Sequence, residues 1–461
     1  MTNSSQSTST SRRVWELAWP TIISNLLFTT VGFMHIKLAA GLGTSAVAAV
    51  STGHRVFFLI QAILMGLSVA ATALVARHWG SGSREQAELV SWTSVALAML
   101  VAALVSTPVV LQPMAIAGLF GLDEQSTRDA ARFIFWMSLF NVFSAINMML
   151  STALRATGDV ITPLWYLLFS SVLNVLVGYL MAYGIGPFPK LGVAGLSLGG
   201  SLAAATVTVA FVMAWWKGQF QVKALKQWRI DRSSARQIIR IGMPALLEQG
   251  VVQLSFLAFF AIVALYGTEA YAAYGIGITL VSFPIVIGFG FGMATATLVG
   301  QQLGAQNPEA AISAGWRSLR MALAAMAGVS VFLLWYARDL AAFMIEAEEV
   351  IDLTVAFIYI IAFCQPLMAI EFTLASALRG AGDTRYPLLV TFCGIVAGRL
   401  LPAVLIAWLS LPVYWLFACM VTDYGIKAIM LVIRYRKGHW VESRVIASNQ
   451  PAEELPVDTS K

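Results

Sequence analysis

The sequence predicts an all-α integral membrane protein, with twelve transmembrane helices in two six-helix bundles. Of the 461 residues, 59% are hydrophobic and only 11% are charged, and the mean hydropathy of +0.78 excludes an ordinary soluble enzyme. Apolar runs of about 20 residues, the length that crosses the ~30 Å hydrocarbon core as a helix, recur throughout the chain. The two halves of the chain also repeat one another.

Twelve apolar runs define the expected spans. We place them at about 14–39, 47–76, 89–112, 131–154, 161–184, 191–216, 241–265, 271–300, 314–337, 353–378, 386–408 and 412–435.

The internal repeat relates residues that are 224 positions apart. Pro20 matches Pro244, and the segment ALRATGD at 153–159 matches ALRGAGD at 377–383. Each half holds six spans, and because six is even, both halves enter the membrane from the same side. The repeats are therefore parallel, related by a two-fold axis along the membrane normal, and a substrate site is expected between them near the midplane.

The repeat also sets the domain boundaries. We expect an N-terminal lobe at 14–217 and a C-terminal lobe at 240–437, joined by a basic linker at 218–239. Polar segments at 1–13 and 438–461 are expected to be disordered tails. Lys and Arg concentrate in the loops on the side of the N-terminus, so both termini and the linker are predicted to be cytoplasmic.

Several function classes lack the residues that they need. The chain has no GxxxxGK[ST] segment to bind ATP, and its one GxSxG match, at 195–199, lies within an apolar span, so we expect no enzyme and no cofactor. The three cysteines lie in apolar spans without CxxC spacing, which predicts neither a disulfide framework nor a zinc site. Basic residues in short loops between spans indicate membrane topology and no nucleic-acid partner.

Ionisable residues within the spans are the candidate cation-coupling site. Glu248, Glu371 and Asp423 all lie in the second half, and the repeat places neutral Ser24 and Asn147 opposite the first two. A charged residue in a membrane helix is costly, by roughly 2.5–3.5 kcal/mol on insertion scales, and by default marks an ion or substrate pathway. A carboxylate kept from water can exchange a proton near neutral pH, and alternatively Glu248 and Glu371 can hold Na⁺.

Four polar residues are candidates for the substrate cavity: His35, Asn147, Asn174 and Arg399. Structural alternatives stand beside them. Arg399 and Asp423 can form a buried salt bridge, His35 can be a satisfied residue near a helix end, and Asn174 can bond a neighbouring helix. Two further basic residues, Arg155 and Arg379, precede glycine turns in the ALRxxGD segments, where we expect them to close loops at helix C-termini.

Seven segments together carry a family resemblance: TLVGQQLGAQ at 297–306 with its copy ALVARHWGSG at 73–82, the paired ALRxxGD segments, LGVAGLSL at 191–198, GRLLPA at 398–403 and RYRKGHW at 434–440. With them, residues 14–440 resemble the multidrug and toxic compound extrusion (MATE) family, closest to its DinF-like and NorM-like bacterial branch.

The resemblance implies a V-shaped pair of bundles in the bacterial inner membrane. It further implies a secondary antiporter that exports organic, often cationic compounds in exchange for H⁺ or Na⁺ by alternating access. We expect the protein to be a monomer. The second-lobe acids of the family map to Glu248, and Glu371 lies about one turn from the Asp of some members. The N-terminal lobe of this chain departs from the family pattern. His35 occupies the position where many members have an acid in the first helix, and Gly178 occupies the position of a second acid in the fifth helix, while the asparagine of the family pattern is present as Asn174.

Two alternatives to the antiporter remain. A lipid-linked saccharide flippase of a related superfamily should show a basic central cavity, whereas bases within the spans are few. A passive channel would need no buried acids, and dependence of transport on an ion gradient separates it from the antiporter.

Overall fold

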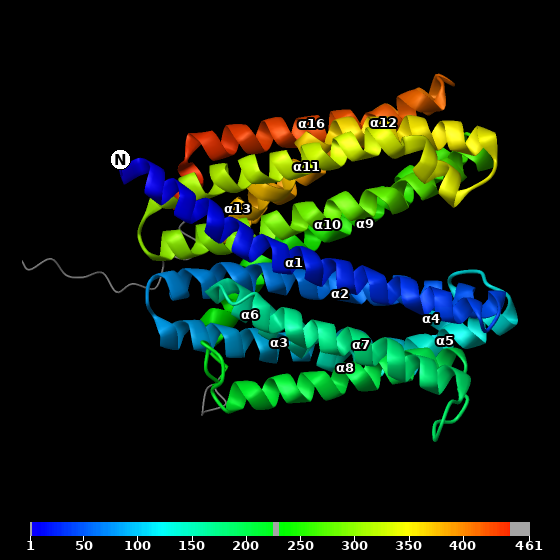
Figure 1. The fold of residues 1–461 in the computed structure, drawn as a ribbon, viewed down its shortest axis with the longest axis horizontal. Helices are drawn as coiled ribbons and strands as arrows, with labels where there is room; N and C mark the ends of the chain where they lie inside the picture. Colours follow the sequence, from blue (N-terminus) through cyan, green and yellow to red (C-terminus); the bar gives the residue numbers. More distant parts are fainter. Residues whose placement is uncertain (1, 225–229, 443–461) are drawn as a thin grey trace, which may run out of the picture.

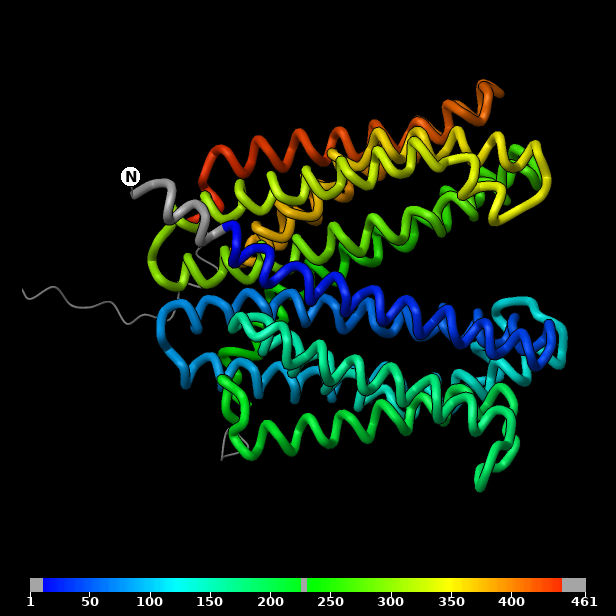
Figure 2. The backbone as a smooth tube through the Cα atoms, in the orientation of Figure 1, coloured from blue at the N-terminus to red at the C-terminus, as the bar shows by residue number. Residues whose placement is uncertain are grey.

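Two bundles of long helices lie side by side in the computed structural model, which describes residues 2–224 and 230–442 (Figure 1). Within that part of the chain, eleven helices are long and apolar enough to cross a membrane, and a bent helix pair brings the number up to twelve. Figure 2 shows that the long helices run back and forth along one common direction. The predicted all-α membrane fold is therefore confirmed.

The N-terminal lobe is built from the first half of the chain. Its helices are α1 (Thr2–Ala40), α2 (Thr44–Gly80), α3 (Arg84–Leu111), α4 (Pro113–Gly118), α5 (Glu124–Leu139), α6 (Asn141–Thr157), α7 (Ile161–Tyr183) and α8 (Val193–Trp216).

The C-terminal lobe contains two short π-helical segments, η1 and η2, within its spans. Its elements are α9 (Arg232–Ala264), α10 (Thr268–Gly304), α11 (Pro308–Met344), α12 (Glu348–Ile370), η1 (Glu371–Ala375), α13 (Ser376–Gly380), α14 (Arg385–Cys393), η2 (Gly394–Leu400), α15 (Leu401–Trp408), α16 (Val413–Lys437) and the 3₁₀ turn η3 (His439–Glu442).

Several element boundaries differ from those expected. The first helix begins at Thr2, so the tail expected at 1–13 is helical from that residue on. The linker expected at 218–239 ends earlier, because Asp231 caps α9 by accepting hydrogen bonds from the backbone and hydroxyl of Ser234 at 2.7 and 2.6 Å. The fourth expected span is two helices, α5 and α6, bent by 49°. The tail expected at 438–461 begins with η3, and its remainder, 443–461, lies outside the described residues.

The ALRxxGD segments form equivalent turns in the two lobes. Gly158 and Gly382 adopt positive φ values of 102° and 88°, which favour glycine after a helix C-terminus. Each turn is followed by an aspartate that accepts a hydrogen bond from the next helix, from Thr162 N to Asp159 at 3.0 Å and from Tyr386 N to Asp383 at 3.3 Å. The loop-closing role expected of these segments is confirmed.

Small residues bring the two lobes together. α1 and α2 of the N-terminal lobe pack against α9 and α10 of the C-terminal lobe. A Cβ on Gly66 would press on the backbone of Gly242, and one on Gly290 would press on Ala18 and Ile22. Because these contacts are related by the 224-residue repeat, the interface has the two-fold symmetry that the sequence predicts.

A second symmetric pair of contacts lies further along α2 and α10. A Cβ on Gly80 would overlap the backbone carbonyl of Gln301, and a Cβ on Gly304 would overlap that of Arg77. This is also the end at which the chain passes between lobes, because the Lys223 backbone donates to Glu88 at 3.0 Å, near the start of α3. We call it the linker end.

The other ends of the same helices carry exposed apolar side chains. Phe33 on α1, Leu257 on α9 and Phe283 on α10 are 66%, 71% and 56% exposed. In Figure 1, α1 runs obliquely, and it contacts α10 and α11 of one lobe as well as α2 and α7 of the other. The lobes therefore meet at the linker end, and α1 is a helix that both lobes share.

Candidate functional site

Six charged side chains gather inside the C-terminal lobe. The charged cluster consists of the acids Glu248, Glu371 and Asp423 and the bases Arg379, Arg399 and Lys427, carried by α9, η1, α13, η2 and α16. All three acids were expected from the sequence to form the cation-coupling site. The structure places each of them against at least one basic side chain.

Glu248 is held by three hydrogen bonds from two other elements. Arg379 donates from Nη2 to Oε1 at 2.6 Å and from Nε to Oε2 at 3.3 Å. Thr391 Oγ1 donates to Oε1 at 2.8 Å. Glu248 is only 4% exposed, so this is a nearly complete protein environment for the carboxylate. Arg379, which the sequence predicted to be a loop-closing residue, is thus also part of the site.

Lys427 occupies the space between the other two acids. Its Nζ lies 3.2 Å from Glu371 Oε1 and 3.2 Å from Asp423 Oδ1, and Asp423 also pairs with Arg399. The second oxygen of Glu371, Oε2, is buried without a hydrogen-bond partner. The buried salt bridge between Arg399 and Asp423, which the sequence analysis gave as the structural alternative, is therefore present. Lys427 connects this pair to Glu371.

Local backbone features explain how these groups approach one another. Glu371 and Arg399 lie in the π-helical segments η1 and η2, and π-helical turns inside α-helices occur frequently at functional sites. Glycines let η2 approach α16 closely, since a Cβ on Gly394 would lie 2.6 Å from Asp423 Oδ1 and one on Gly398 would lie 2.7 Å from Asp423 Cα.

The cluster is balanced in charge, with three acids and three bases. Glu248 and Glu371 have different basic partners, Arg379 and Lys427, which is unlike the shared carboxylate pair expected for Na⁺. Over residues 2–224 and 230–442, no group of three or more His, Cys, Asp or Glu side chains is placed to hold a metal ion. The two glutamates are therefore held in separate ion pairs within the lobe.

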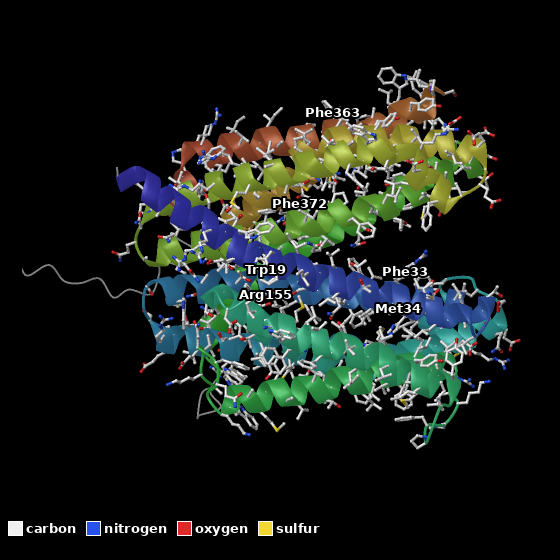
Figure 3. The ribbon with its side chains drawn as sticks, in the orientation of Figure 1. Trp19, Phe33, Met34, Arg155, Phe363 and Phe372 are labelled. Atoms are coloured by element: carbon white, nitrogen blue, oxygen red, sulfur yellow. The ribbon has the colours of Figure 1, made fainter. Side chains whose placement is uncertain are left out.

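The equivalent positions of the N-terminal lobe lack this network. Ser24, opposite Glu248 in the repeat, donates to the backbone of Pro20 at 2.8 Å. Asn147, opposite Glu371, accepts from Ser151 Oγ at 3.2 Å and donates to Thr208 Oγ1 at 3.5 Å. Arg155 is the basic residue at the position equivalent to Arg379. It has no ion pair in the described residues, and its Nε is buried without a hydrogen-bond partner. Figure 3 places it in the same half of the molecule as Trp19.

His35 and Asn174 form a different polar site in the N-terminal lobe. His35 Nε2 lies 2.7 Å from Asn174 Oδ1, and His35 Nδ1 lies 3.3 Å from Nε2 of His54 on α2. This site lies toward the end of the molecule away from Arg155, beside the Phe33 and Met34 that Figure 3 labels. The expected cavity residues therefore fall in separate places, with Arg399 in the charged cluster and Asn147 against α8.

Sequence reasoning missed two members of these sites, Lys427 and His54. Lys427 lies four residues after Asp423, which is one helical turn, so its spacing was a usable signal. His54 has no such signal, because its partner His35 lies 19 residues earlier on another helix.

Comparison with known proteins shows which family and which relatives this chain resembles. The family model MatE matches residues 20–180 and 244–405, one match in each lobe. The probable multidrug resistance protein NorM of Thermotoga maritima is 28% identical over 458 residues, covering 95% of each chain. The uncharacterized transporter YisQ of Bacillus subtilis is 22% identical over 433 residues, covering 93% of this chain and 95% of the relative.

A solved structure has the same fold. A mutant form of VcmN, a MATE transporter of Vibrio cholerae, superposes with a TM-score of 0.88 at 20% identity, covering 96% of this chain and 99% of that one. The two ranges that the family model matches fall one in each lobe of this fold. The chain belongs to the MATE family of membrane transporters, whose members are not enzymes.

Proposed function

We propose that the chain is a secondary active multidrug efflux antiporter that exports organic, often cationic compounds from a bacterial cell in exchange for protons. The family match and the probable multidrug resistance relative support export of small organic molecules. The observation that carries the coupling is the charged cluster, in which Lys427 bridges Glu371 and Asp423 inside a membrane lobe.

Lys427 favours H⁺ over Na⁺ as the coupling ion. A sodium ion that bound Glu371 together with Asp423 would need the space that the Lys427 ammonium group occupies, 3.2 Å from each carboxylate. A proton needs no such space, because it can add to the free Oε2 of Glu371. Protonation would neutralise Glu371 and leave Lys427 paired with Asp423, so the cluster can change its partners one charge at a time.

Ion binding drives transport only through its difference between conformations. In this structure the lobes meet at the linker end, through Gly80 with Gln301 and Gly304 with Arg77. The cation-coupling residues of this account are Glu248, Glu371 and Asp423. Glu248 is held by groups of α13 and α14, so a change in its pairing would move those elements relative to α9.

The topology belongs to the same proposal. We place both termini and the linker in the cytoplasm, on the basis of the Lys and Arg distribution, and the protein in the bacterial inner membrane as a monomer. The linker end, where the lobes are in contact, is then the cytoplasmic end. The exposed apolar side chains of α1, α9 and α10, which include Phe33, Leu257 and Phe283, would then lie toward the opposite side, which is where a substrate leaves.

Reconstitution tests this function directly. The purified chain is placed in liposomes with a cationic dye, and efflux is followed under an imposed pH gradient, an imposed Na⁺ gradient or no gradient. We expect concentrative dye movement with the pH gradient alone. Movement driven only by Na⁺ would assign the other ion, and dye flux that ignores both gradients would indicate a passive channel. Transfer of a lipid-linked saccharide without dye transport would identify a flippase.

A further inference from the structure

Three arginines lie on one face of α9 at the linker end. Arg232, Arg236 and Arg240 are spaced by four residues, so they follow one another at intervals of about one helical turn, and all three are exposed. Within residues 2–224 and 230–442, none of the three has an ion pair with an acid. The adjacent acid, Asp231, accepts hydrogen bonds from Ser234. We call the three residues the arginine stripe.

The arginine stripe is continued by apolar side chains on the same face of the helix. Together with Ala235 and Ile239, the three arginines line an open groove of about 520 Å³. Further along this face, Met243 and Leu247 are also exposed. Basic groups at the membrane surface followed by apolar groups match a phospholipid, whose anionic headgroup is joined to acyl chains.

This face of α9 points away from the rest of the protein. On the opposite side of the helix, Ile238 and Ile241 pack into the hydrophobic core of the N-terminal lobe. A Cβ on Gly242 would lie 2.9 Å from the carbonyl oxygen of Gly66. Thr384 of the C-terminal lobe donates to the carbonyl of Ile241 at 2.7 Å. Both lobes therefore hold the buried side of α9, and the arginine stripe is left on the outer surface.

The length of α9 puts the arginine stripe at the depth of lipid headgroups. The helix has 33 residues, which at 1.5 Å per residue makes it about 50 Å long, more than the ~30 Å hydrocarbon core. Its apolar sequence begins at Ile241, directly after the last arginine of the stripe. At such a boundary an arginine extends its guanidinium group to the interface, where its planar fork can bind a phosphate through two hydrogen bonds.

The internal repeat shows that the fold does not require three unpaired arginines here. In α1, Arg12 is equivalent to Arg236, but Glu16 is equivalent to Arg240, and the position equivalent to Arg232 is a threonine. Arg12 Nε donates to Glu16 Oε1 at 2.8 Å. α1 therefore carries an ion pair where α9 carries two like charges. Two like charges one turn apart repel one another, which an anion placed between them would relieve.

We propose that the arginine stripe is a binding site for an anionic phospholipid. Arg232, Arg236 and Arg240 hold the phosphate, and the acyl chains lie along Ile239 and Met243. Resting on the topology of the proposed function, the lipid belongs to the cytoplasmic leaflet, whose anionic lipids attract basic segments beside a span. The site is separate from the charged cluster, and its ligand is not the transported compound.

Native mass spectrometry tests this site without any transport assay. The purified chain is stripped of lipid in detergent and titrated with phosphatidylglycerol or, as a neutral control, with phosphatidylcholine. Each arginine beside an anionic lipid is worth about fivefold in affinity, so Arg232→Gln/Arg236→Gln/Arg240→Gln should bind phosphatidylglycerol on the order of 100-fold more weakly. Binding of phosphatidylcholine should not change. Equal binding of phosphatidylglycerol by wild type and this triple variant would overturn the proposal.

Two further variants separate a local site from a general loss of charge. Arg13→Gln/Arg436→Gln/Lys437→Gln removes three exposed charges from other helices at the same end of the molecule and should bind phosphatidylglycerol as wild type does (Figure 1). Arg240→Glu gives α9 the kind of ion pair that α1 has at the equivalent positions, so the helix should stay folded while the affinity falls. A control triple variant as weak as the stripe variant would assign the effect to net charge and overturn the site.

Inorganic phosphate distinguishes a lipid site from a simple anion site. An excess of phosphate, compared with chloride at the same ionic strength, should leave most of the phosphatidylglycerol bound, because burial of the acyl chains also contributes to affinity. Displacement of all the lipid by phosphate would overturn the assignment to a lipid. These readouts come from binding to the purified chain. Failure of gradient-driven dye transport would therefore overturn the proposed antiport and leave the lipid site standing.

Discussion

Arg379 donates two hydrogen bonds to Glu248, from Nη2 at 2.6 Å and from Nε at 3.3 Å, across 131 residues of chain. The repeat carries the arginine in both lobes but the acid in only one, because Ser24 stands opposite Glu248 and Arg155 opposite Arg379. The fold itself thus does not require the pair. Its presence in one lobe is a specific difference between two otherwise equivalent bundles.

Removing only one member of this pair should be strongly destabilising. Glu248→Ala leaves Arg379 in a largely buried place without its counter-charge, which we expect to lower the free energy of unfolding by about 3–5 kcal/mol. Glu248→Leu combined with Arg379→Met removes both charges and should recover most of that loss. Thermal unfolding in detergent measures the difference. A double variant as unstable as Glu248→Ala would show that packing, not charge, holds this site.

Transplanting the acid to the other lobe tests the equivalence of the repeats. Arg155 Nε is buried without a partner, so Ser24→Glu should bring a carboxylate to it as Glu248 is brought to Arg379. We expect Ser24→Glu to unfold at a higher temperature than the double variant Ser24→Glu/Arg155→Gln, in which the new acid has no base. Identical unfolding temperatures for the two proteins would mean that residue 24 does not reach Arg155.

Lys427 should act as a built-in cation between two carboxylates. In Lys427→Met the acids Glu371 and Asp423 lose the ammonium group they share, which frees a site for a cation from solution. We expect Na⁺ to stabilise this variant, by about 2.7 kcal/mol when its concentration is 100 times the Kd, and to leave wild type unaffected. Lys437→Met, an exposed change on the same helix, is the matched control. Equal Na⁺ stabilisation of wild type would instead support a native sodium site.

The glycine contacts at the linker end should control the closed arrangement of the lobes. Ala at Gly80 or Gly304 would press on the backbone of Gln301 or Arg77, so each change should separate α2 from α10 there. Distances between spin labels on the two lobes should lengthen at the linker end, and transport should fall. Gly328→Ala, where no atom lies within 4 Å of the new Cβ, should leave both readouts unchanged. Unchanged distances in the Gly80 and Gly304 variants would remove these contacts from the transport cycle.

Much of the architecture follows from the sequence because membrane helices and repeats leave strong patterns. Apolar length predicted the spans, and the offset of Pro20 from Pro244 predicted two lobes with equivalent contacts. The bend between α5 and α6 and the π-helical segments leave no comparable pattern, since they depend on tertiary packing.

The acids of the charged cluster were predictable from the sequence, but the side chains that pair with them were not. A buried acid such as Glu371 is conspicuous in an apolar run, whereas its pairing with Lys427 depends on how η1 packs against α16. Arg379 looked like a helix-end residue, and it is one, yet its side chain also reaches Glu248 on α9. His54 needed the fold to bring α2 against His35.

The most direct test of the coupling role of the charged cluster uses Glu371→Gln in liposomes that contain a cationic dye. Glutamine fills the same space but cannot change its charge, so we expect dye exchange at equilibrium to persist and dye accumulation driven by the pH gradient to be lost. Glu349→Gln, an exposed change at the start of α12, should keep both. Full gradient-driven accumulation by Glu371→Gln would contradict the account, because coupling would then run without Glu371 Oε2, the oxygen to which we propose that the proton adds.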